Sequence, residues 1–126
     1  MTRSFHQFPC EGEQLIGSLD SGSRNIGLLI VSGGNEIRSG AHAGMSKLAQ
    51  DVAKAGFPVF RYDRRGIGDS TGNNQEFLSS EQDLKSAVAQ FRTLCPDLSG
   101  IVAFGNCDAA TALAFFGRST DLTAYI

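Results

Sequence analysis

The stretch that decides the fold is IVAFGNCDAATALAFF, residues 101–116: an apolar run, a turn of small residues and a second apolar run. The pattern predicts a buried strand over 101–106 that passes sharply into a helix over 108–117. Cys107 stands at the turn, where a side chain is lifted clear of the sheet. Gly105 and Ala109, two residues to either side, are small enough for strand and helix to pack closely. This is the spacing of a nucleophile elbow, G-x-S-x-G, with a thiol for the hydroxyl, so Cys107 is a candidate nucleophile.

Strand and helix patterns alternate through the rest of the chain. The continuous apolar run at 26–31 (IGLLIV) is typical of a central strand covered on both faces. Apolar stripes at helical spacing predict two helices, with members Met45, Leu48, Ala49, Val52 and Ala53 in the first and Leu84, Ala87, Val88, Phe91 and Leu94 in the second. Strands are expected at 3–10, 14–19, 26–31, 58–62, 101–106 and 122–126, and helices at 43–55, 79–95 and 108–117.

This alternation predicts one α/β domain over residues 1–126. We expect a three-layer α/β/α arrangement with a mostly parallel sheet of about six strands and helices on both faces. The first two strands form an antiparallel edge through the turn 11–13. Loops 33–44, 63–74 and 106–108 leave the carboxyl ends of strands, so they are expected to converge on one cleft.

Composition narrows the classes of partner. A net charge of −2 without a basic patch argues against nucleic acid as a partner, and no segment is long and apolar enough to span a membrane. Three widely spaced cysteines suit neither a disulfide framework nor a metal site. We therefore expect reduced thiols, a cytoplasmic protein, no metal and no cofactor, with Cys10 and Cys95 structural.

The strand ending in Gly33-Gly34, the segment 62–70 (YDRRGIGDS) and the Cys107 elbow together resemble the N-terminal half of an α/β-hydrolase. Within that superfamily the chain is similar to the hydrolases associated with exosortase A systems, bacterial loci linked to protein sorting and exopolysaccharide. The resemblance implies that Cys107 is the nucleophile and that the backbone N–H of Asp108 is one oxyanion donor. Gly34 or Asn35 would supply the second donor.

The resemblance also implies an acid and a histidine after the nucleophile, and the chain has neither in the expected place. Its two histidines, His6 and His42, both precede Cys107. The sequence is therefore expected to be a C-terminally incomplete hydrolase domain, without the Asp and His of the triad.

Two functions follow from these observations. The first is a hydrolase or acyltransferase that acts on a small ester or thioester through Cys107. The second is a truncated, catalytically silent fragment that serves as an association module and pairs its open sheet edge with a partner or with itself.

The loop 63–70 has a structural interpretation of its own. Asp63 is expected to accept hydrogen bonds from backbone donors of its turn, and the glycines to supply positive φ angles. Arg64 and Arg65 are suited either to an anionic substrate group or to pairing with local carboxylates. A dinucleotide loop is rejected, because the glycines at 66, 68 and 72 do not have the G-x-G-x-x-G spacing.

Overall fold

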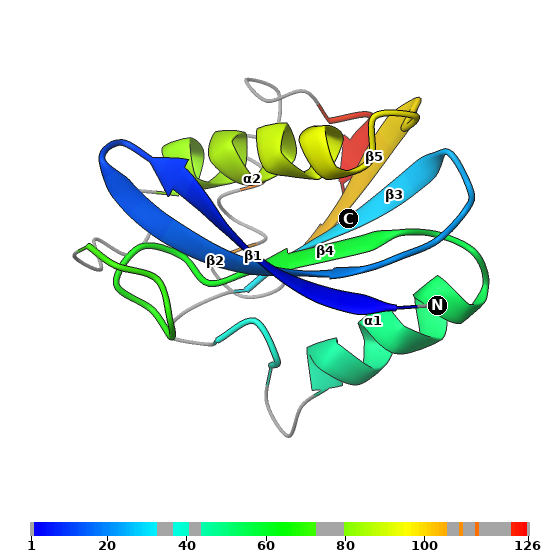
Figure 1. Cartoon of the computed structure of the whole chain (residues 1–126), viewed down its shortest axis with the longest axis horizontal. Helices are drawn as coiled ribbons and strands as arrows, with labels where there is room; N and C mark the ends of the chain where they lie inside the picture. The colour runs from blue at the N-terminus through cyan, green and yellow to red at the C-terminus, as the bar shows by residue number, and fades with distance from the viewer. Residues whose placement is uncertain are drawn as a thin grey trace.

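The computed structural model of the chain describes residues 2–32, 37–40, 44–72, 80–105, 109, 113 and 122–125. Three strands come first, and α1 and α2 then flank β4 before the last two strands (Figure 1). The strands are β1 (Arg3–Cys10), β2 (Glu13–Asp20), β3 (Ile26–Val31), β4 (Val59–Tyr62), β5 (Gly100–Gly105) and β6 (Ala124–Tyr125), and the helices are α1 (Gly44–Lys54) and α2 (Ser80–Leu94).

The six strands form one mixed sheet in the order β1-β2-β4-β3-β5-β6. β1 and β2 are an antiparallel hairpin whose last pair is Cys10 with Glu13, and the two-residue turn between them, Glu11-Gly12, has positive φ at both positions. β2 pairs antiparallel with β4, whereas the pairs β3–β4, β3–β5 and β5–β6 are parallel. The expected antiparallel edge and central 26–31 strand are both confirmed.

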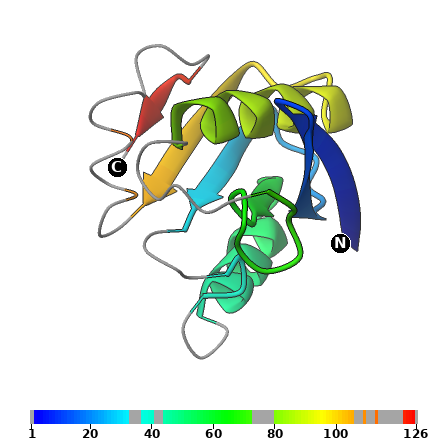
Figure 2. The same cartoon turned by 90° about the vertical axis from the view of Figure 1, so that its left-hand side faces the viewer.

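Helices cover the two faces of this sheet, α1 on one and α2 on the other (Figure 2). Each helix turns its predicted apolar stripe toward the sheet, because burying that stripe removes it from water. The α1 stripe packs on Ile30 and Val59, and the α2 stripe packs on Leu29, Phe60 and other residues of the opposite face. The three-layer α/β/α class expected from the sequence is confirmed.

Element ends depart from the expected ranges by one or two residues. β2 is one residue longer at each end than the predicted 14–19, and β4 begins one residue after the proline at position 58. β6 is shorter than the predicted 122–126, because Leu122 and Thr123 are not in strand conformation. Thr123 is nevertheless bonded to β5: its N–H donates to the carbonyl of Ile101 at 2.8 Å, and its hydroxyl accepts the N–H of Ile101 at 3.1 Å. Residues 43, 79, 106 and 126 of the predicted ranges lie outside the described residues. The same holds for the predicted helix 108–117, of which only Ala109 and Leu113 are described, both as helical.

No helix among the described residues is long and apolar enough to cross a membrane.

Candidate functional site

Three strands end side by side at one edge of the sheet. Val31, the last residue of β3, is paired with Tyr62 at the end of β4 on one side and with Gly105 at the end of β5 on the other. The connection after β3 leads to α1, whereas Ala109 and Leu113 join the core on the opposite, α2 face. Adjacent parallel strands whose connections leave to opposite faces mark the switch point at which α/β sheets bind ligands.

The end of β5 packs tightly on the helical residues that follow it. A Cβ built on Gly105 would lie 3.0 Å from the Cβ of Ala109 and 3.2 Å from Cδ1 of Leu113. Ala109 and Leu113 are both helical and buried. The chain therefore passes from strand to helix within three residues, and small residues at 105 and 109 are what let the two elements approach.

The predicted catalytic residues themselves lie outside the described residues. These are Cys107, Asp108, Gly34, Asn35 and also His42. Their catalytic roles stay predictions, and the structure describes only the elements from which they extend.

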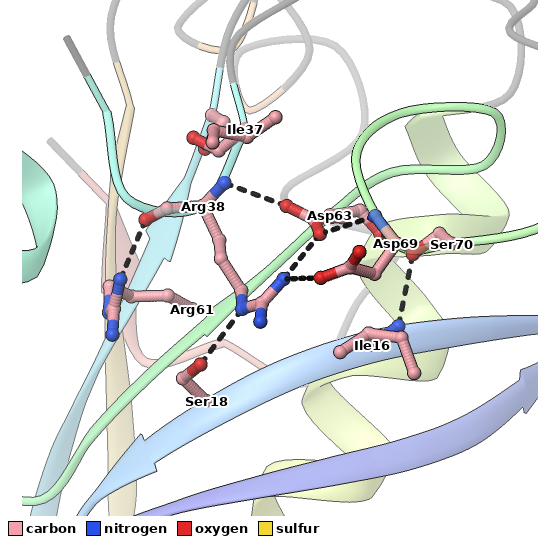
Figure 3. A network of polar contacts seen from close by, with 9 residues as sticks. Ile16, Ser18, Ile37, Arg38, Arg61, Asp63, Asp69 and Ser70 are labelled. Carbon is pink, nitrogen blue, oxygen red and sulfur yellow. Dashed lines mark hydrogen bonds and ion pairs between the residues drawn. The ribbon is translucent and has the colours of Figure 1, made fainter. Parts of the chain in front are cut away.

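Asp63, the first residue after β4, is the centre of a buried polar network (Figure 3). Its Oδ1 accepts the main-chain N–H of Arg38 at 2.7 Å, and its Oδ2 accepts Nη1 of Arg38 at 2.5 Å and the N–H of Asp69 at 3.0 Å. The Arg38 guanidinium also lies 3.2 Å from the Asp69 carboxylate and donates through Nε to Ser18. The network ties the loop after β3 to the loop after β4.

The backbone around Asp63 is held from the other side by β2. Its N–H donates to the carbonyl of Ile16 at 2.9 Å, and its own carbonyl accepts the Ser70 hydroxyl at 2.6 Å. The Ser70 oxygen in turn accepts the N–H of Ile16 (Figure 3). Gly68 has a φ of +55°, and a Cβ there would collide with the Asp63 carboxylate. The predicted structural role of this loop is confirmed.

The two arginines after Asp63 have different environments. Arg65 pairs with Asp83 at 2.5 Å and with Glu11 at 3.1 Å, so the interpretation as a partner of carboxylates is confirmed for it. Arg64 is buried, and its Nε and Nη2 have no acceptor among the described residues. Sequence spacing could not separate these two neighbours, because the acids that pair with Arg65 are 18 and 54 positions away along the chain.

Cys10, Cys95 and His6 are outside the predicted catalytic set, and their environments do not favour a catalytic role. Burial raises the pKa of the Cys10 thiol, which donates to Asp83 at 3.3 Å, and burial also raises the pKa of Cys95. His6 lies on the edge strand β1 and shares a hydrogen bond with Ser4. Within the described ranges, no group of three or more histidine, cysteine or acidic side chains is arranged to hold a metal ion.

Two charged residues of this region, Arg38 and Arg61, are not among the site residues predicted from the sequence. Arg38 is in a loop 25 positions from Asp63, and no local pattern links them. Arg61 is buried within β4, and this burial is the main reason that its pKa is lowered to about 10. The charges of Arg3 and Arg38 lower the pKa further, and those of Asp20 and Asp63 oppose the shift. The signal for Arg61 is present in PVFRY, because a charged residue in a buried strand needs a partner or a site.

Comparison with known proteins supports the assignment of the fold. No protein-family model and no curated protein matches the chain. Among solved structures, it is similar to the α/β hydrolase GrgF from Penicillium sp. sh18, with 26% identity over 99% of this chain and 45% of that one, at a TM-score of 0.79. It is also similar to the esterase Pf2001 of Pyrococcus furiosus, with 22% identity over 98% of this chain and 47% of that one, at a TM-score of 0.79.

A third similar structure is XC6422 from Xanthomonas campestris, described as an α/β serine hydrolase without a lid. The identity is 14%, over 99% of this chain and 60% of that one, and the TM-score is 0.78. The chain thus spans about half the length of the structures it resembles. The likeness to GrgF, at 26% identity over 99% of this chain, assigns the chain to the α/β-hydrolase superfamily.

Proposed function

We propose that this chain carries the nucleophile of an α/β-hydrolase that acts on an ester or thioester through Cys107, as a hydrolase or an acyltransferase. The observation that carries the proposal is the approach of Gly105 to Ala109 at the end of β5. Cys107 is the middle one of the three residues between the end of β5 and the helical Ala109, and we propose that these three residues form the tight turn of the elbow. The turn begins at the edge where β3 and β4 also end.

The chemistry of the proposal is acyl transfer to sulfur. The Cys107 thiolate attacks the carbonyl carbon, and the backbone N–H groups of Asp108 and of Gly34 or Asn35 hold the resulting oxyanion. Collapse of this intermediate expels the alkoxide or thiolate, which takes up a proton, and leaves an acyl-Cys107 thioester. Water then attacks the thioester in a hydrolase, or an alcohol, amine or thiol in a transferase, and the thiol is regenerated.

The position at the start of a helix supports the thiolate. Unsatisfied N–H groups and the positive end of the helix dipole lower the pKa of a thiol placed there. A thiol also needs a general base less than a hydroxyl does, because a few per cent is already ionised at neutral pH. Acylation of Cys107 is therefore expected without a histidine. Rapid turnover requires a general base, and neither His6 nor His42 is in the position, after the nucleophile, that the resemblance gives to the catalytic histidine.

The similar structures support the substrate class. Pf2001 is an esterase, and Est1E from Butyrivibrio proteoclasticus has been solved with ferulic acid bound. We extend the ester class from these proteins to this chain. A cytoplasmic location, which would keep the thiol reduced, and a link to exosortase and exopolysaccharide loci remain predictions from the sequence and its resemblance.

The proposal is tested with p-nitrophenyl acetate and the intact chain. We expect a burst of nitrophenol that approaches one equivalent per chain, together with an acetyl group on Cys107 in the peptide mass map. Iodoacetamide near neutral pH is expected to modify Cys107 first, because burial raises the pKa of the other two thiols.

Two variants make the outcome specific. Cys107→Ala should abolish the burst, whereas Cys95→Ala, which removes a half-buried thiol, should retain it. A burst that survives in Cys107→Ala, or an acetyl group found on Cys95 instead, would overturn the proposed nucleophile.

A further inference from the structure

A cavity of about 300 Å³ lies on the α1 face of the sheet, beside the network around Asp63. Its floor is a row of three directly paired residues on adjacent strands, Phe5 of β1, Ser18 of β2 and Arg61 of β4. Residues paired in this way direct their side chains to the same face of a sheet. Ser46 of α1 and Ser39 of the preceding loop complete the wall.

Three guanidinium groups line this cavity, and two of them are already paired. Arg3 holds Asp20 with two bonds of 2.6 and 2.7 Å. Arg38 is paired with Asp63 and Asp69, as described above. Arg61 has no carboxylate within ion-pair distance among the described residues.

Arg61 is instead left with an unused donor. It is 3% exposed, and its Nη1 donates to the carbonyl of Arg38 at 2.9 Å (Figure 3). Its Nε is buried and has no acceptor in the described part of the chain. Asp20 and Asp63 attract the Arg61 charge without forming an ion pair with it, so they offset the cost of its burial only in part. An anion that enters the cavity and contacts the guanidinium would relieve more of that cost.

Two exposed apolar side chains at the cavity indicate that its ligand also has an apolar part. Phe5 and Ile37 are the two large hydrophobic side chains that are exposed among the described residues, at 67% and 48%, and both line this cavity. Exposed apolar groups beside a buried cation favour a ligand that combines a charged head with an apolar body. The nearby Asp69 carboxylate, 72% exposed, would repel such a head.

We propose that this cavity binds an organic carboxylate with a compact apolar body, with the carboxylate on Arg61 and the apolar part against Phe5 and Ile37. The hydroxyls of Ser39 and Ser46 line the same cavity and are available to donate hydrogen bonds to the carboxylate of the ligand. A guanidinium is suited to this role because its planar fork matches the two oxygens of a carboxylate. None of these residues belongs to the catalytic set proposed above.

The test uses benzoate as the probe and benzamide, its uncharged analogue of the same shape, as the comparison. Titrations followed by NMR or calorimetry at constant ionic strength should give saturable binding of benzoate and at least about tenfold weaker binding of benzamide. Acetate, which has the charge without the apolar body, should also bind more weakly. Equal binding of benzoate and benzamide would overturn the proposal.

Variants assign the binding to Arg61. Arg61→Met should weaken benzoate binding at least about tenfold. Arg24→Met, which removes the same charge from an exposed side chain stacked on Phe57, should leave it unchanged. An equal loss in both variants would contradict the proposal.

A third variant keeps the test decisive if Arg61→Met does not fold. Asp69→Asn removes an exposed carboxylate at the cavity and should tighten benzoate binding by about two- to fivefold. No change in this variant would count against the site. Cys107→Ala should bind benzoate like the parent chain, so a failure of the proposed nucleophile would not affect this result.

Discussion

At the scale of single residues, Asp63 explains why the segment 62–70 has its pattern. The carboxylate accepts hydrogen bonds from two backbone N–H groups and from a guanidinium. These three donors are enough to stabilise the buried charge without water. Gly68 is required because a side chain at that position would collide with the carboxylate. Ser70 is required because its hydroxyl joins Asp63 to β2. The motif is thus a self-consistent turn that carries the chain away from the end of β4.

Replacement of this acid should be costly for stability. We expect Asp63→Asn to lower the free energy of unfolding by about 2–4 kcal/mol, because Arg38 loses its buried counter-charge and the new amide presents donors to donors. Urea denaturation followed by circular dichroism measures the loss. Asp69→Asn, whose side chain is 72% exposed, is the matched control and should cost less than about 1 kcal/mol. Equal losses in the two variants would show that burial of the Arg38–Asp63 pair is unimportant.

At the scale of elements, the junction after β5 depends on the absence of a side chain. Gly105 ends the strand, and Ala109 and Leu113 lie over it at contact distance. A helix can start so close to a strand end only if both facing positions are small.

Enlargement of Gly105 should therefore disturb both stability and reactivity. Gly105→Val is expected to cost about 1–3 kcal/mol, since its methyl groups would overlap Ala109 and Leu113. It should also slow the iodoacetamide reaction of Cys107, measured by mass spectrometry.

Gly44 provides the control for this substitution. A Cβ built on it, at the first residue of α1, meets nothing within 4 Å, so Gly44→Ala should be neutral or slightly stabilising. Gly105→Val with unchanged stability and unchanged labelling would contradict the packing argument.

At the scale of the whole molecule, a column of aromatic rings joins elements that are distant in sequence. Phe60 of β4 lies with its ring centre 5.7 Å from that of Phe8 in β1 and 5.7 Å from that of Phe91 in α2. Gly17 and Gly27 leave the space that the rings of Phe60 and Phe91 occupy. The larger apolar cluster therefore extends without a break from β1 to Leu113.

Loss of the central ring should weaken the molecule as one unit. Phe60→Ala is expected to lower the free energy of unfolding by about 3–5 kcal/mol, because it leaves a cavity between β1 and α2. Phe5→Ala, at a side chain that is 67% exposed, should change stability by no more than about 0.5–1 kcal/mol. Thermal unfolding by near- and far-ultraviolet circular dichroism should show a single transition in both variants. Separate melting of the two signals in the parent chain would contradict a single core.

The pattern of residues over short distances was enough to predict most of the elements and the edge at which a site belongs. Strands such as 26–31 and the stripes of α1 and α2 could be predicted because burial of one face depends on spacing within a few residues. The meeting of the loops after β3 and β4 also followed, because parallel strands end at a common edge. The residues predicted to act in catalysis lie outside the described part, so their roles remain to be tested by the burst experiment.

The sequence by itself determined the α/β class, the alternation of strands and helices and the small-residue junction at Gly105, because each of these is written in residues that are near neighbours. Only the tertiary structure decided that Arg38 would pair with Asp63 and that Arg61 would be buried with its Nε left without an acceptor among the described residues. It also placed Phe5, Ser18 and Arg61 together in one cavity. These contacts depend on the strand order β1-β2-β4-β3, which pairs Ser18 with Arg61 and brings Arg38 to Asp63, 25 positions along the chain, and no local periodicity encodes that order.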